Sequence, residues 1–374
     1  MKSSSDIIII GGGIIGCAIA NRLAAEGLNI TIIEKGEPGR EASWAAAGML
    51  APHAEAAHSV PSVSSNLMQA SHALYPDFVA ELEEETGIQI GYQVGGSLVV
   101  ATDYREATML AGLLERQLAV DRPAEEFTAQ QVHDMQPGLA ESVQSALFFQ
   151  HDHYVNNRRL MKALVASARK HGVQFRTMTP VIGLECEQSR ISGVLTPDGL
   201  QEADVVVNAA GAWAGTLDPS SNIRLSVRPI RGQIVQVQVQ PQMLNQLIHS
   251  SGCYIVPWPD GRTLIGSTLE NVGFDNSVTA AGVQALLSAA IKIVPALKEA
   301  VVKDMWAGLR PDTSDNLPIL GCTGIQNYII ATGHFRNGVL LAPITARLIS
   351  ELVLSGQPSI PLAPFSAARF SADP

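Results

Sequence analysis

The pattern of apolar residues changes twice within the N-terminal 34 residues, and it predicts one strand–helix–strand unit. After Asp6, residues 7–10 are all isoleucine, which is typical of a parallel strand that is buried on both faces. Residues 14–26 then carry small and apolar side chains at helical spacing, and Gly27 stands where a helix would end. Residues 29–33 predict a second buried strand, with Glu34 at its carboxyl end.

The rest of the chain divides into helical and strand-like segments. Apolar residues recur at helical spacing in four segments: 67–86, 104–119, 157–171 and a last one that ends near residue 354. Residues 203–208 predict another buried strand. Residues 234–240 alternate between aliphatic residues and glutamine, which predicts a strand of an antiparallel sheet with one solvated face. Residues 259–261 (Pro-Asp-Gly) are a hairpin signal between two further strands.

This order of segments predicts an α/β fold with two kinds of sheet. A Rossmann-type dinucleotide-binding domain, with a parallel sheet and helices, is predicted from three separated segments: 1–88, 147–221 and 306–374. A mainly antiparallel β domain with helices, which would bind the substrate, is predicted from 89–146 and 222–305. The length of 374 residues agrees with two domains of about 150 residues or more each.

Composition and charge exclude several classes of protein. Apolar residues make up 46% of the chain and charged residues 16%, against about 25% charged in a typical domain. Such a chain can bury a large core, so it is not intrinsically disordered. The net charge of −10 has the wrong sign for wrapping a phosphate backbone. We therefore expect no nucleic-acid partner.

The sequence also predicts a cytoplasmic protein. We find no apolar run near the roughly 20 residues that cross a bilayer, and the N-terminal apolar run is too short for a signal peptide. Cys17, Cys186, Cys253 and Cys322 are scattered, without CxxC or metal-ligand spacing. This pattern favours reduced thiols and no membrane association.

A GxGxxG motif lies inside the predicted strand–helix–strand unit. Gly11 would allow the tight turn, Gly13 would let the backbone approach a pyrophosphate, and Gly16 would let the helix pack on the strand. The start of the helix then offers N–H groups and a positive dipole to the phosphates. Glu34 would accept hydrogen bonds from ribose hydroxyls. The alternative is a glycine-rich turn with a surface glutamate, which the full context disfavours.

The cofactor is predicted to carry its own redox centre. No second GxGxxG motif and no CxxxxC motif appears in the chain, which disfavours a second dinucleotide and a dithiol reductase. Residues 45–49 have almost no side-chain bulk, so their backbone could lie against the flat ring of FAD. The alternative for these residues is the start of an ordinary alanine-rich helix.

Several stretches of the sequence resemble one family of flavoproteins. They are the glycine fingerprint, 43–52 (SWAAAGMLAP), 205–211, 308–312 (GLRPD) and 333–338 (GHFRNG). Together they resemble the D-amino-acid-oxidase family, and within it the subgroup of bacterial glycine oxidases that supply an imine for the thiazole of thiamine. The resemblance extends to about residue 355, and the last two stretches are specific to the subgroup.

The resemblance implies the residues that line FAD. In the family the adenosine end lies on the first strand–helix–strand unit, and the flavin meets the loop and helix start at 334–340. A helix start there would also stabilise the negative charge of a reduced flavin. Segment 308–310 has no cysteine at the place where some relatives anchor flavin, so we expect non-covalent FAD. The implied cofactor residues are Gly11, Gly13, Ile14, Ile15, Gly16, Glu34, Lys35, Ala42, Ser43, Ala47, Gly48, Met49, Val181, His334, Phe335, Arg336, Asn337, Gly338, Val339 and Leu340.

The resemblance also implies a carboxylate-binding site. In the family, the positions that match Arg310 and Tyr254 hold the substrate carboxylate, and the position that matches Arg336 lies close by. An arginine can bind a carboxylate with two parallel hydrogen bonds. From the residues alone, Arg310 next to Pro311-Asp312 is more typical of a loop ion pair and Tyr254 of a hairpin core. The resemblance instead favours substrate binding for both residues.

By the same resemblance the protein oxidises small amino acids. The Cα hydrogen of a neutral amine would leave as hydride to flavin N5, so no general base is needed and no catalytic side chain is nominated. The resulting imine would hydrolyse to a 2-oxo acid and ammonia, and O₂ would become hydrogen peroxide. Relatives are commonly tetramers, so we expect a homo-oligomer.

Two rival functions and the substrate preference stay open. One rival is a sarcosine or D-amino-acid dehydrogenase with an acceptor other than oxygen. The other is a non-catalytic dinucleotide-binding regulator, which the charge and the lack of a DNA-binding module disfavour. One methyl group changes binding by only about 1–3 kcal/mol. The sequence therefore does not rank glycine, sarcosine, D-alanine and D-proline.

Three further segments carry weaker signals. Residues 51–66 have no clear period, and we interpret them as a loop over the substrate entrance. His151 and His153 would share one strand face, but no third ligand is evident, so we expect no metal. Trp44 stands where relatives often have a smaller polar residue, and its ring is not placed by the sequence.

Overall fold

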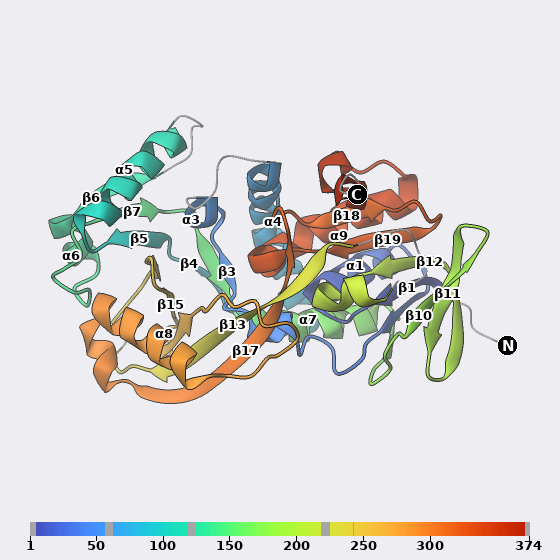
Figure 1. The fold of residues 1–374 in the computed structure, drawn as a ribbon, viewed down its shortest axis with the longest axis horizontal. Helices are drawn as coiled ribbons and strands as arrows, with labels where there is room; N and C mark the ends of the chain where they lie inside the picture. Colours follow the sequence, from blue (N-terminus) through green and yellow to red (C-terminus); the bar gives the residue numbers. More distant parts are fainter. Residues whose placement is uncertain (1–4, 57–62, 119–123, 218–224, 242, 371–374) are drawn as a thin grey trace.

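The computed structural model describes residues 5–56, 63–118, 124–217, 225–241 and 243–370. Two large mixed sheets lie side by side, and the long strands β13 and β17 run from one towards the other (Figure 1). The structure thus has the predicted α/β architecture, with a Rossmann-type sheet covered by helices and a mainly antiparallel second sheet.

The first sheet has parallel pairs at its centre. Its path runs β10-β11-β12-β1-β2-β9, and β19 adds to β12 and to β18. The pairs β1–β2, β1–β12, β2–β9 and β12–β19 are parallel, whereas β10–β11–β12 form an antiparallel extension. The strands are β1 (Ser5–Ile10), β2 (Ile30–Ile33), β9 (Gln174–Arg176), β10 (Gly183–Glu187), β11 (Arg190–Thr196), β12 (Gly199–Asn208), β18 (Ile319–Cys322) and β19 (Tyr328–Thr332).

The second sheet is antiparallel apart from the β14–β5 pair. Its order is β17-β13-β16-β15-β14-β5-β7-β6. These strands are β5 (Ser97–Ala101), β6 (Glu125–Thr128), β7 (Ser145–Phe149), β13 (Val227–Gln238), β14 (Leu247–His249), β15 (Tyr254–Pro257), β16 (Arg262–Gly266) and β17 (Val301–Thr313). A small sheet of β3 (Met49–Leu50), β8 (His153–Val155) and β4 (Tyr92–Val94) lies between the large ones in sequence and space (Figure 1).

Helices cover both sheets. The α-helices are α1 (Ile14–Ala25), α2 (Ala42–Ala45), α3 (Pro52–Ala56), α4 (Val63–Thr86), α5 (Tyr104–Leu118), α6 (Ala129–Met135), α7 (Asn157–Lys170), α8 (Ala280–Ile293) and α9 (Gly338–Ser355). Short 3₁₀ helices are η1 (Gly211–Thr216), η2 (Pro295–Glu299), η3 (Phe335–Asn337), η4 (Ala363–Phe365) and η5 (Ala367–Phe370).

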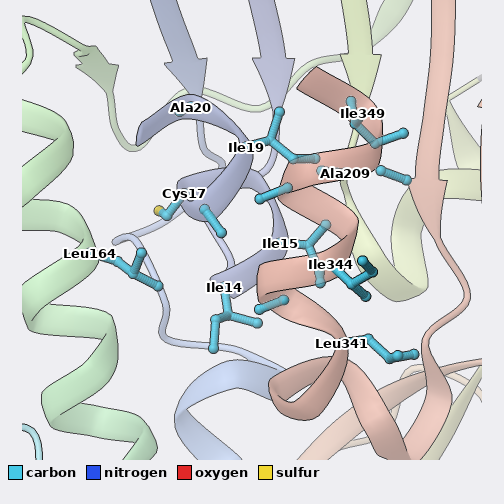
Figure 2. Close-up of a cluster of buried hydrophobic side chains, with 14 of the residues drawn as sticks. Ile14, Ile15, Cys17, Ile19, Ala20, Leu164, Ala209, Leu341, Ile344 and Ile349 are labelled. Carbon is cyan, nitrogen blue, oxygen red and sulfur yellow. The ribbon is translucent and has the colours of Figure 1, made fainter. Parts of the chain in front are cut away.

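Helix α1 is buried on nearly all sides because it lies between α7 and α9. Figure 2 shows Cys17 on the side of Leu164 of α7, while Ile15 faces Ile344 of α9. Ile19 and Ala20 have no exposed surface. An all-round apolar helix is stable only inside such a core. Among the described residues the cysteines are free thiols, and burial beside Glu34 raises the pKa of Cys17 well above its usual value.

Helix α9 is long and apolar enough to cross a membrane by composition alone, which the sequence analysis did not anticipate. Its window is 61% buried against the rest of the protein, as expected for a core helix. Pro343 lacks an N–H, so the carbonyl of Val339 has no intrahelical donor four residues on. The hydroxyl of Tyr75 on α4 donates to that carbonyl at 2.5 Å, and Ser71 donates to the next one at 2.6 Å.

The predicted elements are confirmed apart from some boundaries and one loop. The loop predicted over 51–66 is wrong at both ends, because α3 and α4 begin at Pro52 and Val63, and residues 57–62 lie outside the described residues. Helix α8 was not predicted. The domain boundaries stay a prediction, and those at 146/147 and 305/306 fall inside β7 and β17.

Candidate active site

A cavity of about 330 Å³ opens where the carboxyl ends of the parallel strands meet one face of the second sheet. This edge of a parallel sheet is where ligands bind in doubly wound folds. Its lining comes from both sheets, from η1 and from the segment between β2 and β3. The lining residues discussed below are Gly11, Gly13, Glu34, Lys35, Ala42, Ser43, Ala45, Gly48, Trp213, Gly232, Ile234, Tyr254, Ser267, Gly308, Arg310, His334, Phe335, Arg336, Gly338 and Val339.

The glycine loop is required by the tight packing around it. Gly11 has φ +101°, and a Cβ there would lie 2.6 Å from the carbonyl oxygen of Ala209. A Cβ on Gly16 would collide with the carbonyl oxygen of Gly11, so this glycine lets α1 lie on β1. Helix α1 then starts towards the cavity at Gly13 without a side-chain cap of its own, so its dipole favours an anion there.

Glu34 is fixed at the carboxyl end of β2. Its carboxylate accepts hydrogen bonds from the N–H of Gly12 at 2.7 Å and of Gly36 at 2.9 Å, and the residue is buried. A carboxylate has about four acceptor sites. It therefore keeps acceptor capacity at the cavity wall, as the ribose prediction requires.

Lys35 ties the end of β2 to two other parts of the chain. Its ammonium lies 2.8 Å from the carboxylate of Glu41 and 3.2 Å from the ring centre of Trp213 on η1. The Trp213 ring in turn packs against Phe274, in the loop between β16 and α8, at 5.4 Å between ring centres. The loop after β16 of the second sheet therefore supports the Trp213 ring at this end of the cavity.

The small-residue segment 42–48 forms a wall of the cavity, and hydrogen bonds to its backbone carbonyls hold it in place. The Asn157 side chain donates to the carbonyl of Ser43 at 2.7 Å, and Trp306 Nε1 donates to the carbonyl of Ala45 at 2.9 Å. The hydroxyl of Ser43 accepts from the N–H of Ile14 at 2.9 Å, which joins this wall to the start of α1. Only residues 42–45 are helical, so the alternative of an alanine-rich helix holds for one turn.

The ring of Trp44 points away from this wall into a stack of its own. It packs edge-on against Trp306 at 5.5 Å between ring centres. The guanidinium of Arg158 lies 3.5 Å from the centre of the Trp44 ring and 4.3 Å from that of Trp306. The large residue at position 44 is therefore accommodated by a cation–π contact on the far side of the wall.

Another wall of the cavity is a face of the second sheet. Arg310 on β17 and Tyr254 on β15 both line it, so the structure brings these two predicted carboxylate-binding residues to the same cavity. Arg310 Nη2 donates to Ser267 Oγ at 2.6 Å and Nη1 to the carbonyl of Thr268 at 3.3 Å. Arg336 lines the cavity from the β19–α9 loop and is exposed to solvent.

The β19–α9 loop brings a second helix start to the cavity. His334 is fully buried, and burial lowers its pKa to about 3, so its imidazole is neutral at pH 7. Its Nε2 lies 3.0 Å from the hydroxyl of Thr345. Helix α9 begins at Gly338, which lines the cavity with Phe335 and Val339. A buried neutral imidazole and the positive end of a helix dipole suit an electron-rich ring.

Most predicted cofactor residues line the cavity, and three do not. Gly16 supports packing, Asn337 precedes the first residue of α9, and Leu340 is buried in the core. Ser267 and Gly232 were not predicted as site residues, but they line the cavity beside Arg310. No motif marked either residue, because their role depends on strand pairing.

The prediction that His151 and His153 share one strand face is wrong. β8 begins at His153, whereas His151 lies in an exposed turn. Asp152 between them is buried and accepts from the ring of His53 at 2.8 Å and from Ser97 at 2.6 Å. Within the described residues no three histidine, cysteine or acidic side chains are placed to hold a metal ion.

Known proteins resemble this chain over nearly its whole length. The family model described as FAD dependent oxidoreductase matches residues 6–352. A glycine oxidase of Geobacillus kaustophilus is 38% identical over 373 residues, which cover 99% of this chain and 98% of that protein. The bifunctional protein ThiO/ThiG of Trichormus variabilis is 38% identical over 369 residues, or 98% of this chain. The chain spans only 55% of that protein's length.

A solved structure agrees with the fold in detail. The crystal structure of glycine oxidase from Geobacillus kaustophilus superimposes with a TM-score of 0.94. The match covers 98% of this chain and 99% of that one, at 37% sequence identity. The two-sheet arrangement around the cavity is therefore shared with that enzyme.

Proposed function

The chain belongs to the FAD-dependent oxidoreductase family, and on that premise we propose that it oxidises glycine and related small amines or D-amino acids. The products would be the 2-oxo acid (glyoxylate from glycine), ammonia and hydrogen peroxide. The observation that carries the proposal is that Arg310 and Tyr254 line the same cavity as the small-residue segment 42–48.

The chain's own groups fit FAD as cofactor. Two helix starts, those of α1 and α9, face the cavity, and Glu34 supplies a buried carboxylate at one end. The 42–48 wall has almost no side-chain bulk on the cavity side, which leaves room for a flat ring. When bound, FAD supplies the hydride acceptor and passes the electrons to O₂.

The protein's contribution to the reaction is to bind and orient the amino acid. The Arg310 fork would hold the carboxylate with the Tyr254 hydroxyl beside it, which aims the Cα hydrogen across the cavity. His334 is neutral and adds no positive charge to the lining of the cavity. The proposal assigns no side chain the role of general base.

Oxygen consumption with glycine and without an added dye tests the proposal. We expect hydrogen peroxide in equal amount to oxygen consumed. If glycine bleaches the flavin in the absence of oxygen, but oxygen does not then reoxidise the flavin, the result would favour a dehydrogenase. Flavin that no small amino acid bleaches would favour a non-catalytic regulator. Anaerobic bleaching by glycine, sarcosine, D-alanine and D-proline would rank the substrates.

Three further proposals accompany this function. FAD is held non-covalently, so acid precipitation should leave the yellow colour in the supernatant. The protein is a cytoplasmic homo-oligomer, a tetramer by family resemblance, which light scattering after gel filtration would measure. It serves thiamine thiazole synthesis, a proposal supported by its likeness to ThiO/ThiG proteins. Deletion of its gene should then make growth depend on added thiamine, and restoring glycine oxidation should remove that dependence.

A further inference from the structure

The substrate-facing wall of the cavity is unusual because glycines occupy much of it. Residues that pair across antiparallel strands point to the same face. Gly232 pairs with Gly308, and Gly266 pairs with both Ile234 and Tyr254. Since Arg310 lies two residues beyond Gly308, its side chain is on this face as well. The two proposed substrate-binding side chains therefore share one face with three glycines.

Each glycine leaves room for a different neighbour. A Cβ on Gly232 would lie far inside 3.0 Å of Nη1, Nη2 and Cζ of Arg310. A Cβ on Gly266 would lie 2.5 Å from both Cζ and the hydroxyl oxygen of Tyr254. The guanidinium and the phenol thus lie flat on the sheet at the places where side chains would otherwise stand.

Gly308 serves the other wall of the cavity. A Cβ there would collide with Cβ of Ala45, in the 42–48 wall. That neighbour is attached directly to the backbone, so the whole segment would have to move. By contrast, the atoms that meet Gly232 and Gly266 are the far ends of side chains that can turn aside.

Hydrogen bonds hold the Arg310 guanidinium down in this position. Ser267 and Thr268, which accept from its two terminal nitrogens, directly follow Gly266 at the end of β16. The same corner of the sheet therefore carries the missing side chain under Tyr254 and the acceptors that orient Arg310. Glycine inside a strand weakens the sheet, and it is often found where another group lies close to the backbone. Here those close groups are the side chains of Arg310 and Tyr254.

We propose that Gly232 and Gly266 are positioning residues that set the geometry of carboxylate binding, because they let Arg310 and Tyr254 lie flat against the sheet. The proposal rests on the proposed function for the identity of the substrate, but the positioning role requires only that a carboxylate binds here. A side chain at either position lifts the fork or the phenol off the sheet, into the space of the carboxylate.

The test compares alanine variants of the purified FAD-loaded protein. Acetate serves as the carboxylate probe, with its Kd measured from the change in the flavin spectrum, and FAD content is measured beside it. In Gly232→Ala and Gly266→Ala we expect full FAD content, with acetate Kd and glycine KM raised about tenfold or more and kcat changed less. Gly308→Ala should instead lower FAD content. Gly138→Ala, whose Cβ would make ordinary contacts with Met243, should change nothing.

A double variant separates positioning from simple damage. Lysine at 310 ends in a single ammonium on a flexible stem that can turn aside. In an Arg310→Lys background, Gly232→Ala should therefore raise acetate Kd by no more than about twofold. If Gly232→Ala alone does not fold, recovery of yellow soluble protein in the double variant supports the same contact, and failure to recover overturns it.

The outcomes distinguish this proposal from the proposed function. Unchanged acetate Kd in a folded Gly232→Ala protein, or equal losses in both backgrounds, overturns the positioning role. So does a wild-type protein that holds FAD but shows no response to acetate. A wild-type protein that binds acetate yet does not oxidise glycine would contradict the proposed function alone, while the glycine variants still test positioning.

Discussion

The two large sheets build the cavity in opposite ways. The first sheet offers strand ends, where turns and helix starts present backbone groups, and its most important residues are Gly11 and Gly16. The second sheet offers a flat face, where Arg310 and Tyr254 lie over missing side chains. A side chain added at Gly11 or Gly16 would meet backbone atoms, which cannot move aside. A side chain added beneath Arg310 or Tyr254 on the second sheet would meet the ends of those side chains, which can rotate, so we expect a smaller loss of binding there.

This contrast predicts that the largest effect comes from the first sheet. In Gly16→Ala the new methyl group would collide with the carbonyl oxygen of Gly11, and neither backbone can retreat. We expect loss of FAD and of about 3 kcal/mol or more of unfolding free energy, measured by flavin absorbance and urea denaturation. At Gly12 a Cβ would meet only side-chain atoms, at 3.3 Å or more, so Gly12→Ala should lose less. A stable yellow Gly16→Ala protein would contradict the contrast.

Arg310 variants should show an intermediate effect that is confined to the substrate. Loss of a charge-assisted contact costs about 1.5–3 kcal/mol, or roughly tenfold to over a hundredfold in affinity. Arg310→Ala should therefore raise glycine KM by that factor and lower kcat less, since the carboxylate is bound in both ground and transition states. Arg310→Lys should fall between, because it keeps the charge and loses the fork.

Flavin content is the control for these variants. It should stay near wild type, because Arg310 is assigned to the substrate wall. Unchanged glycine kinetics in a flavin-loaded Arg310→Ala protein would falsify the assignment, and loss of flavin or fold would instead favour a structural ion pair.

The contact between α4 and β8 should become less stable in acid, because it contains His72 and His153. Burial lowers the pKa of His72 and lowers that of His153 to about 4, and the neighbouring His72 also disfavours a positive charge on His153. Their rings lie 4.6 Å apart, between α4 and β8. The unfolded chain takes up these protons near pH 6.5, so the free energy of unfolding should fall as pH drops from about 6.5 to 4.

Thermal denaturation across this pH range measures the effect. His153→Gln should flatten the profile, because one of the two half-buried titrating rings is gone. His133→Gln on α6, outside this cluster, is the matched control and should keep the wild-type slope. A wild-type slope in His153→Gln would remove the histidines as its cause.

The smallest expected effect concerns the stack behind the 42–48 wall. Trp44→Ser removes an aromatic pair and a cation–π contact that together contribute about 1–2 kcal/mol. Stability should fall by that amount in chemical denaturation. Glycine KM should change less than about twofold, because Asn157 and Trp306 hold the wall through backbone carbonyls. A tenfold change in KM would show that the ring itself shapes the cavity.

The sequence by itself determined the parts of this protein that are local. Periodicity predicted β1, α1 and β2, and the glycine spacing with Glu34 predicted a dinucleotide site. Family motifs then indicated Arg310 and Tyr254. These signals succeed because helix and strand periods, and the contacts of one tight turn, are set by residues close together in the chain.

The tertiary structure alone decided which distant residues meet. Gly232 carries no motif, and its role appears only when β13 pairs with β17 and places it under Arg310. Asp152, which no motif marked, is the buried partner of His53 from a segment 99 residues away. Such contacts depend on strand register and on packing between elements, which one sequence does not encode locally.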